Sequence, residues 1–356
     1  MNRLPNLDPL RFFLASTVLL FHLPQLSRNQ GLPFFDDLPI YHRGLEAVYM
    51  FFVLSGFLII RIIYRAKLRD VFSIKDFYIR RILRIFPLYY LVLGFGLLFY
   101  NVILPYLDIP FPINYTWKEA FFYTVFFLPN VFAKVFDPGG IIAVLWSIGI
   151  EEQFYLMIAP MLFFINTKWV LRFLSVLLVG YFIFYWSDVF VILRKFTFVY
   201  FYLFFGGVVA ILEERNKLGF LKRSPIIPLL VCTLTLLFFI TDWFMIGPLW
   251  LRDLFTCVLF GFFIHSLAFN NHGIELRSKF LDHLGHISYG IYMYHAIVLN
   301  AVVFLFLKLE ILQNLNWTIT IVLMHLLTFA GTLLIAHLSY TYFELYFLKL
   351  KNKFRK

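Results

Sequence analysis

The chain has few charged residues and almost no cysteine. Of its 356 residues, 14% are charged and 62% are apolar, whereas soluble domains are about one quarter charged and about half apolar. So few charges cannot cover the surface of a soluble protein, and the apolar content excludes a disordered chain. The two cysteines, Cys232 and Cys257, fall in separate apolar runs. Neither a disulfide nor a metal site is therefore expected.

Apolar runs of membrane-spanning length are abundant instead. A transmembrane helix needs about 20 residues, and open sheet edges are not tolerated in lipid, so the runs are predicted to be helices. The sequence thus predicts an all-α polytopic integral membrane protein with about ten transmembrane helices. The runs lie at 9–23, 45–64, 86–104, 145–165, 170–188, 196–212, 226–245, 250–269, 289–307 and 317–343.

The basic residues predict the orientation. With the N-terminus inside, 22 of the 31 Lys and Arg residues fall in inner segments and eight in outer ones, and the remaining one, Arg11, lies in a span. This asymmetry places both termini in the cytoplasm of a multi-pass protein of the inner (plasma) membrane. The net charge of +11 is therefore a topology signal, and no nucleic-acid partner is expected. We predict one transmembrane domain over 1–348 and a short basic cytoplasmic tail over 349–356.

The longest connection, 105–144, is predicted to lie outside. It contains several prolines and an aromatic stretch from Phe121 to Phe127. One interpretation is a helix that lies on the membrane surface. The other is a lid over an outward-facing cleft, and the sequence leaves both open.

Two ionisable residues share one face of the first span. Arg11 and His22 are eleven residues apart, which brings their directions to within about 20° on a helix and separates them by about 16 Å along its axis. Ionisable groups inside a membrane usually face the protein interior or a water-filled cavity. The alternatives are that Arg11 reaches the headgroups or pairs with Asp8, and that His22 is a packing residue.

Two further segments bring charge toward the bilayer. Arg80, Arg81 and Arg84 are spaced so that their guanidinium groups can converge on a helix, which suits phosphate, although a positive-inside segment on anionic lipid has the same composition. Glu151 and Glu152 adjoin one another in the fourth span, in its predicted outer half. They can orient an imidazole or stabilise a helix start.

The ninth span carries a polar stripe in its first turns. Tyr289, Tyr292 and His295 are spaced i, i+3, i+6, and an interfacial tyrosine belt explains the tyrosines equally well. In the second span, Ser55-Gly56 is consistent with a close helix contact.

These blocks, in this order, resemble the membrane acyltransferase type 3 family of bacterial surface-polysaccharide O-acyltransferases. The resemblance covers nearly the whole chain. The similar blocks are Leu7-Asp8-Pro9-Leu10-Arg11 through His22, Phe51–Ile59, Arg80–Tyr90, Trp146–Tyr155, Ser288–His295 and Tyr342-Phe343-Glu344.

The resemblance implies transfer of an acyl group, typically acetyl, from cytoplasmic acyl-CoA (acetyl-CoA) as co-substrate to a hydroxyl of a cell-surface or lipid-linked glycan. In this hypothesis His22 is the general base that accepts the proton of the hydroxyl, or it helps form a transient acyl carrier. Glu151 or Glu152 orients the imidazole. Arg11 stabilises the developing oxyanion or anchors the acyl donor.

The remaining family blocks imply binding of the acyl donor. Arg80, Arg81 and Arg84 would bind the phosphates of acyl-CoA from the cytoplasm, and Tyr289 and His295 would line the pore. Membrane lipids are the other expected partners, and the sequence does not indicate an oligomeric state. A transporter or flippase of an acylated glycan or lipid is the alternative function, and a membrane scaffold is a third. The Arg11/His22 face combined with a basic cluster favours the enzyme.

Overall fold

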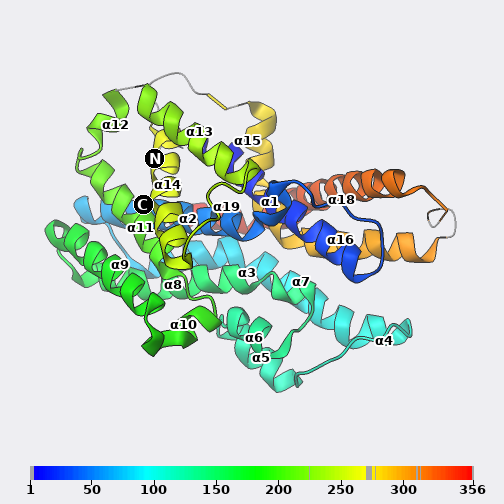
Figure 1. The fold of residues 1–356 in the computed structure, drawn as a ribbon. Coiled ribbons are helices and arrows are strands. Elements are labelled where there is room, and N and C mark those ends of the chain that lie inside the picture. Colours follow the sequence, from blue (N-terminus) through cyan, green and yellow to red (C-terminus); the bar gives the residue numbers. More distant parts are fainter. Residues whose placement is uncertain are drawn as a thin grey trace. The chain divides into compact units, whose positions relative to one another are not determined.

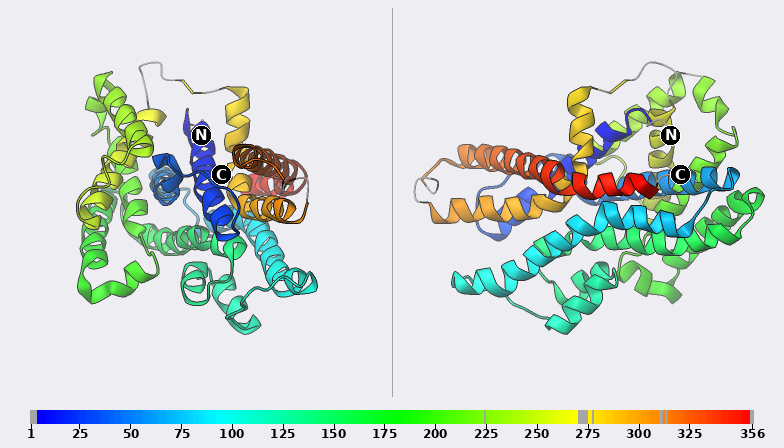
Figure 2. Two further views of the ribbon diagram at one scale, coloured as in Figure 1. Left: turned by 45° about the vertical axis from the view of Figure 1, so that its right-hand side comes forward. Right: turned by 180° about the vertical axis from the view of Figure 1, so that it is seen from behind.

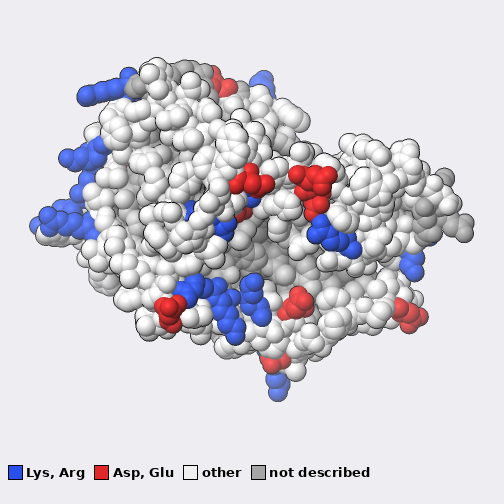
Figure 3. Space-filling model, viewed as in Figure 1, with Lys and Arg blue, Asp and Glu red and all other residues white. Residues whose placement is uncertain are grey.

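The chain folds into helices throughout the part that the structure describes (Figure 1). The structure is a computed structural model and describes residues 4–354, apart from 224, 270–274, 277, 310, 311 and 313. Over these residues the regular elements are α-, π- and 3-10 helices, without a strand. The predicted all-α class is confirmed. Most of the face drawn in Figure 3 is neither basic nor acidic, as the low charge content leads one to expect.

Eight of the described helical segments are long and apolar enough to cross a membrane. A ninth candidate is a pair of helical segments, Asp188–Lys195 and Tyr200–Glu214, bent by 89° at the break between them. Ile226–Ile240 is apolar but shorter. All ten predicted runs are thus helical, and eight reach spanning length alone: Leu7–Asn29, Gly44–Leu68, Ile74–Tyr106, Gly140–Phe164, Thr167–Trp186, Leu249–Ala268, Ser288–Lys308 and Trp317–Lys351. The orientation of the termini stays a prediction.

The described helices fall into two compact units, each made of segments that are distant in the sequence. The first unit joins residues 1–54 to residues 212–341. Its helices are α1 (Leu7–Asn29), η1 (Pro39–His42), the start of α2 (Gly44–Leu68), the end of α11 (Tyr200–Glu214), α12 (Gly219–Arg223), α13 (Ile226–Ile240), α14 (Leu249–Ala268), α15 (Lys279–His286), α16 (Ser288–Lys308) and α18 (Trp317–Ser339).

The second unit joins residues 55–211 to residues 342–356. It contains the rest of α2 and α11, and the predicted boundary at 348 falls within its helix α19 (Leu345–Lys351). Its other helices are α3 (Ile74–Leu98), the π-helix η2 (Phe99–Ile103), α4 (Leu104–Tyr106), α5 (Trp117–Val125), α6 (Pro129–Phe136), α7 (Gly140–Ala143), α8 (Trp146–Phe164), η3 (Thr167–Trp169), α9 (Val170–Trp186), η4 (Asp188–Phe190), α10 (Val191–Lys195), part of η5 (Tyr340–Glu344), α19 (Leu345–Lys351) and η6 (Asn352–Phe354).

In the first unit, α1 packs on α16, and α16 packs on α18 (Figures 1 and 2). Leu19 and Leu23 of α1 are buried against Val298 and Val302 of α16. Lipid tails are as apolar as these side chains, so the gain comes from close packing rather than from escape from water. Gly285 lies so close to the backbone of Asp8 that a side chain there would collide with it. These contacts hold the residues of α1 in fixed positions relative to α16.

In the second unit, Gly56 of α2 lies against the backbone of Leu203 of α11. A Cβ atom at residue 56 would collide with the Leu203 carbonyl group. This is the close helix contact that the Ser55-Gly56 pair predicts, and it belongs to Gly56. The Ser55 side chain is left to make a polar contact, described below.

The connection over 105–144 contains short helices. Thr116 caps α5 by accepting a bond from the Glu119 backbone N–H, while its own backbone N–H and hydroxyl donate to the Glu119 carboxylate. These bonds favour the ionised form, so the pKa of the Glu119 carboxyl is lowered from its ordinary value. This capping box explains why α5 begins at Trp117. Whether the segment lies on the membrane or acts as a lid stays open.

Candidate functional site

The predicted polar face of α1 is present, because α1 is helical without a break from Leu7 to Asn29. Arg11 donates from one of its terminal nitrogens to Asp8 Oδ1 at 2.5 Å. The other carboxylate oxygen of Asp8 lies 3.6 Å from Nε2 of His286 in α15. The pairing of Arg11 with Asp8, one of the two alternatives for this residue, is therefore observed. Its predicted role in the chemistry is a separate question and stays a prediction.

His22 lies beside a second histidine. The imidazole rings of His22 in α1 and His295 in α16 are stacked, with centroids 5.2 Å apart and planes inclined by 26°. His295 is completely buried. Both residues belong to the first unit, where α1 packs on α16. The structure therefore joins two residues that the sequence placed in different roles.

Both imidazoles use Nδ1 for a local hydrogen bond. Nδ1 of His295 lies 2.5 Å from the Tyr292 carbonyl oxygen, and Nδ1 of His22 lies 3.3 Å from Oε1 of Gln25. A carbonyl oxygen can only accept, so each contact places the ring proton on Nδ1. Nε2 is then the basic nitrogen of each ring. Over the described part of the chain, the buried Nε2 of His295 has no hydrogen-bond partner.

The polar stripe predicted on α16 has surroundings that are only partly polar. Tyr292 is buried, and its ring contacts Phe51 and His295 at centroid distances of 6.4 Å and 5.7 Å. Tyr289 is half-buried. Tyr292 therefore supports His295 with both its carbonyl oxygen and its ring, while the pore-lining role of Tyr289 stays a prediction.

In the second unit, Glu151 accepts two side-chain hydrogen bonds. The Ser55 hydroxyl donates to Oε1 at 2.8 Å, and the Tyr155 hydroxyl donates to Oε2 at 2.6 Å. Tyr155 follows Glu151 by four residues, so α8 brings the two side chains to one face. Hydrogen bonds to a charged acceptor are about twice as strong as neutral ones. Glu151 is thus fixed in position by its neighbours.

Glu152 and Arg81 form a second, looser arrangement in the same unit. Only 4% of Glu152 is exposed, and its Oε1 has no hydrogen-bond partner among the described residues. Arg81 of α3 interacts electrostatically with Glu152, and its Nε is also buried without such a partner. The guanidinium carbon of Arg81 lies 5.9 Å and 6.0 Å from the ring centroids of Phe77 and Tyr155.

The three arginines differ in their surroundings. Helix α3 begins at Ile74, where Ser73 caps it, and not at residue 86 as the apolar run suggested. The arginines therefore lie in the first turns of the helix. Arg80 donates to the carbonyl oxygen of Phe354 at 2.6 Å, whereas Arg84 is exposed. Arg81 and Arg84 both interact electrostatically with Glu151 of α8, and Arg81 also does so with Glu152.

The glutamates lie in the middle of their span. Glu151 is eleven residues after Gly140, and Glu152 is twelve residues before Phe164, in the span Gly140–Phe164. The apolar run began at residue 145, whereas the helical turn α7 extends the span to Gly140. The outer-half position of the two glutamates stays a prediction. His22 and Glu151 belong to different units, so the predicted contact between them stays a prediction.

Sequence reasoning missed three supporting residues. Gln25 follows His22 by three residues and Tyr155 follows Glu151 by four, so helical spacing was an available signal for both. Ser55 was interpreted as a packing residue, and only the fold brings it to Glu151.

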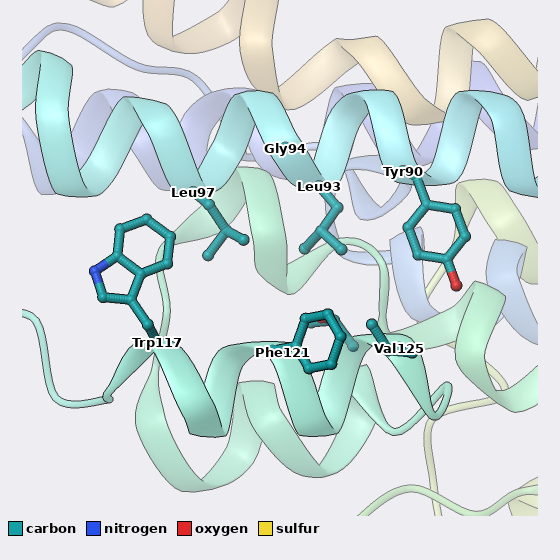
Figure 4. A pocket seen from close by; sticks show the side chains of 8 residues that line it. Tyr90, Leu93, Gly94, Leu97, Trp117, Phe121 and Val125 are labelled. Carbon is teal, nitrogen blue, oxygen red and sulfur yellow. The ribbon is translucent and has the colours of Figure 1, made fainter.

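An apolar groove of about 460 Å³ lies between α3 and α5 (Figure 4). Trp117, Phe121 and Val125 point from α5 toward Tyr90, Leu93 and Leu97 of α3. The groove has no cluster of charged side chains. Among the described residues, no group of three or more His, Cys, Asp or Glu side chains has the arrangement of a metal site.

The described helices of spanning length define a multi-pass membrane protein, and ionisable side chains cluster within these helices. A family model described as "Acyltransferase domain" matches residues 4–337. The chain therefore belongs to this acyltransferase family, and the resemblance noted in the sequence is confirmed. No solved structure matches the chain.

Two curated proteins match part of the chain. One is named "Putative peptidoglycan O-acetyltransferase YrhL", from Bacillus subtilis (strain 168), and is 30% identical over 163 residues, which are 43% of this chain and 23% of that protein. The other is named "Peptidoglycan O-acetyltransferase OatA", from Listeria monocytogenes serovar 1/2a, and is 31% identical over 173 residues, which are 47% of this chain and 25% of that protein. The match thus spans about a quarter of the length of each relative.

Proposed function

We propose that the protein is a membrane O-acyltransferase that moves an acetyl group from cytoplasmic acetyl-CoA to a hydroxyl of a cell-envelope glycan. Membership of the acyltransferase family supports the reaction class. The names of the two relatives support acetyl as the acyl group and a glycan as the acceptor. The many basic residues predicted to lie inside support the inner membrane as its location, with the donor reached from the cytoplasm.

The observation that carries the proposal is the geometry of His22. Its Nδ1 is engaged by Gln25, so Nε2 is the nitrogen that can accept a proton. A general base must lie within hydrogen-bond reach of the proton that it removes, and histidine is the side chain most often used. The stack on buried His295 holds the ring in place. Because His22 is only half-buried, a substrate hydroxyl can approach it.

The proposed reaction is a direct transfer of the acetyl group from the thioester to the acceptor hydroxyl. The acceptor oxygen attacks the thioester carbonyl carbon, a C–O bond forms, and the C–S bond breaks. His22 Nε2 takes the hydroxyl proton and returns it to the departing sulfur, which leaves as the thiol of CoA. Arg11 lies about 16 Å from His22 along the axis of α1, so it anchors the acyl donor rather than the oxyanion at the reacting carbon. Acyl transfer through a transient carrier on the enzyme is the variant of this scheme.

The test uses purified full-length protein with labelled acetyl-CoA and a glycan acceptor. Loss of a general base slows a reaction about 10²–10⁴-fold, so we expect His22→Ala to lower transfer by this factor at normal expression. The matched control is His325→Gln, because His325 of α18 is bonded to Tyr41 and to the Ile321 carbonyl oxygen and has no proposed role. Full transfer by His22→Ala would refute the proposal. Wild-type protein that leaves the thioester intact would favour a transporter.

A further inference from the structure

Gln153 of α8 uses both ends of its side-chain amide in hydrogen bonds. Its Nε2 donates to the Phe127 carbonyl oxygen at 2.5 Å and to Asn130 Oδ1 at 2.9 Å. The Tyr200 hydroxyl donates to Gln153 Oε1. Because the Phe127 carbonyl oxygen can only accept, one orientation of the amide satisfies all three partners. Gln153 therefore links α8 to the 105–144 connection and to the start of α11.

Two of the segments linked in this way are places where the backbone leaves the helical path. Phe127 lies between α5 and α6 with a φ of 56°, a conformation that is uncommon for a residue other than glycine and persists where its surroundings hold it. The other place is the break between α10 and α11, where the two segments are bent by 89°. There Asn130 Nδ2 donates to the Phe196 carbonyl oxygen at 2.9 Å, and the Tyr181 hydroxyl donates to that of Phe198 at 2.6 Å. Side chains thus satisfy backbone groups that no helix satisfies at these points.

The contact with α8 lies near the middle of a span. Gln153 is thirteen residues after the start of the 25-residue span Gly140–Phe164. Four residues before it, Gly149 lies so close to Pro129 that a Cβ atom would come within 2.5 Å of the proline ring. Non-helical backbone at this depth of a membrane is tolerated where it is buried in protein or lines a water-filled cavity. The turn around Phe127, which is 7% exposed, meets the first condition.

The same turn packs on α3. The ring of Phe127 lies against the rings of Phe86 and Tyr89, at centroid distances of 4.8 Å and 5.3 Å. The Tyr89 hydroxyl donates to the Thr124 carbonyl oxygen at 3.1 Å, and Tyr89 is completely buried. Residues 124–130 are therefore held between α3 and α8, the helices that carry the arginines and the glutamates of this unit.

We propose that residues 124–130 form a fixed re-entrant wall against α8, and that Gln153 is the positioning residue that holds this wall. Neither interpretation of the 105–144 connection describes it, because a surface helix would not reach this depth and a lid would break the bonds of Gln153 in each turnover. The wall covers the segment of α8 that contains Glu151 and Glu152 and keeps lipid chains from it. The inference rests on the proposed function, which places these glutamates in the site.

The first measurement is tryptic cleavage after Lys134 in purified full-length protein. Lys134 is an exposed residue of α6, and a helix must open locally before it is cut, so the cleavage rate reports how often the wall opens. Gln153→Glu keeps the size of the side chain and replaces both donors with acceptors. We expect it to speed cleavage about ten-fold or more. The matched control is Tyr181→Phe, which loses a bond to the α10–α11 break but none to the wall, and its cleavage rate should stay within about two-fold of wild type.

The second measurement is the rate of acetyl transfer by the same proteins, expressed per folded molecule from size-exclusion profiles. Misplacement of a reacting group by about 1 Å costs about 10²-fold, and we expect Gln153→Glu to lower kcat by about this factor with little change in KM for acetyl-CoA. A residue that contributed only to stability would lower the amount of folded protein and leave kcat unchanged. Gln153→Met, which introduces no charge, gives the same comparison if Gln153→Glu does not fold.

The outcomes separate the inference from the proposed function. Cleavage at the wild-type rate in the folded Gln153 variants would overturn the wall, and so would fast cleavage of wild-type protein that acetyl-CoA slows, since that is the behaviour of a lid. Faster cleavage with unchanged kcat would overturn the positioning role. Wild-type protein that transfers no acetyl group, with cleavage that still depends on Gln153, would refute the proposed function and leave the wall in place.

Discussion

The two units hold polar groups inside the membrane in different ways. In the first unit, His22 and His295 have their Nδ1 atoms bonded to nearby carbonyl oxygens. In the second unit, Glu151 is fixed by two hydroxyl groups, while Arg81 Nε and Glu152 Oε1 are buried without a hydrogen-bond partner among the described residues. A neutral imidazole can be buried at a lower cost than an ion. The first arrangement suits proton transfer, and the second suits binding.

The difference also concerns what each cluster contributes to stability. Glu151 accepts charge-assisted bonds from Ser55 of α2 and from Tyr155 within α8, so it links two helices of its unit. Among the described residues, the histidine stack makes no hydrogen bond between α1 and α16, since the Nδ1 bond of His22 stays within α1 and that of His295 within α16. Removal of a histidine should therefore affect rate more than folding, and removal of a Glu151 partner should affect folding.

The largest expected effect concerns the coupled pair of His22 and His295. Misplacement of a catalytic group by about 1 Å can cost about 10²-fold, so we expect His295→Ala to lower kcat by about this factor. Because His295 acts by positioning His22, KM should change little, and the double variant with His22→Ala should be no slower than His22→Ala alone. Steady-state kinetics of the four proteins measure this. A double variant that multiplies the two losses would show that the histidines act independently.

The next effect tests the stabilising role of the Glu151 cluster. Tyr155→Phe removes one hydrogen bond to a buried carboxylate, and we expect it to lower the free energy of unfolding by about 1.5–3 kcal/mol. The control is Tyr78→Phe, which removes a neutral bond to the Leu156 carbonyl oxygen in the same unit and should cost about 0.5–1.5 kcal/mol. Thermal unfolding in detergent gives both values. Equal losses would mean that Glu151 does not strengthen the bond.

The sequence predicted the helical class and most of the spans, because apolar length alone determines whether a helix can cross a bilayer. It also named the ionisable residues of both clusters, but not their partners Gln25, Tyr155 and Ser55. It did not predict where α3 and α8 begin, since Ser73 and the turn at Gly140 extend these helices beyond their apolar runs. The starts of helices were therefore predicted less well than their identity.

Contacts between helices were the part that the sequence could not provide. His295 follows His22 by more than 270 positions, and only the packing of α1 on α16 brings their rings together. The close approach of Gly56 to Leu203 similarly frees Ser55 for Glu151. Local spacing, by contrast, was sufficient in principle to identify Gln25 and Tyr155 as partners. Partners that lie three or four residues away on a helix can be deduced from the sequence, whereas partners across a helix interface can be identified only from the fold.

The smallest effect concerns Arg11 and Asp8, the ion pair at the start of α1. Both side chains are about one fifth exposed, at 20% and 17%, and partly solvated pairs contribute about 0.2–1 kcal/mol. Asp8→Asn and Arg11→Gln should each lower the free energy of unfolding by this amount. We expect only Arg11→Gln to slow transfer as well, because the proposed contact with the acyl donor belongs to Arg11 and not to Asp8. Equal transfer rates in the two variants would show that Arg11 acts only through its ion pair with Asp8. The chemistry of the first unit would then depend on His22 and His295.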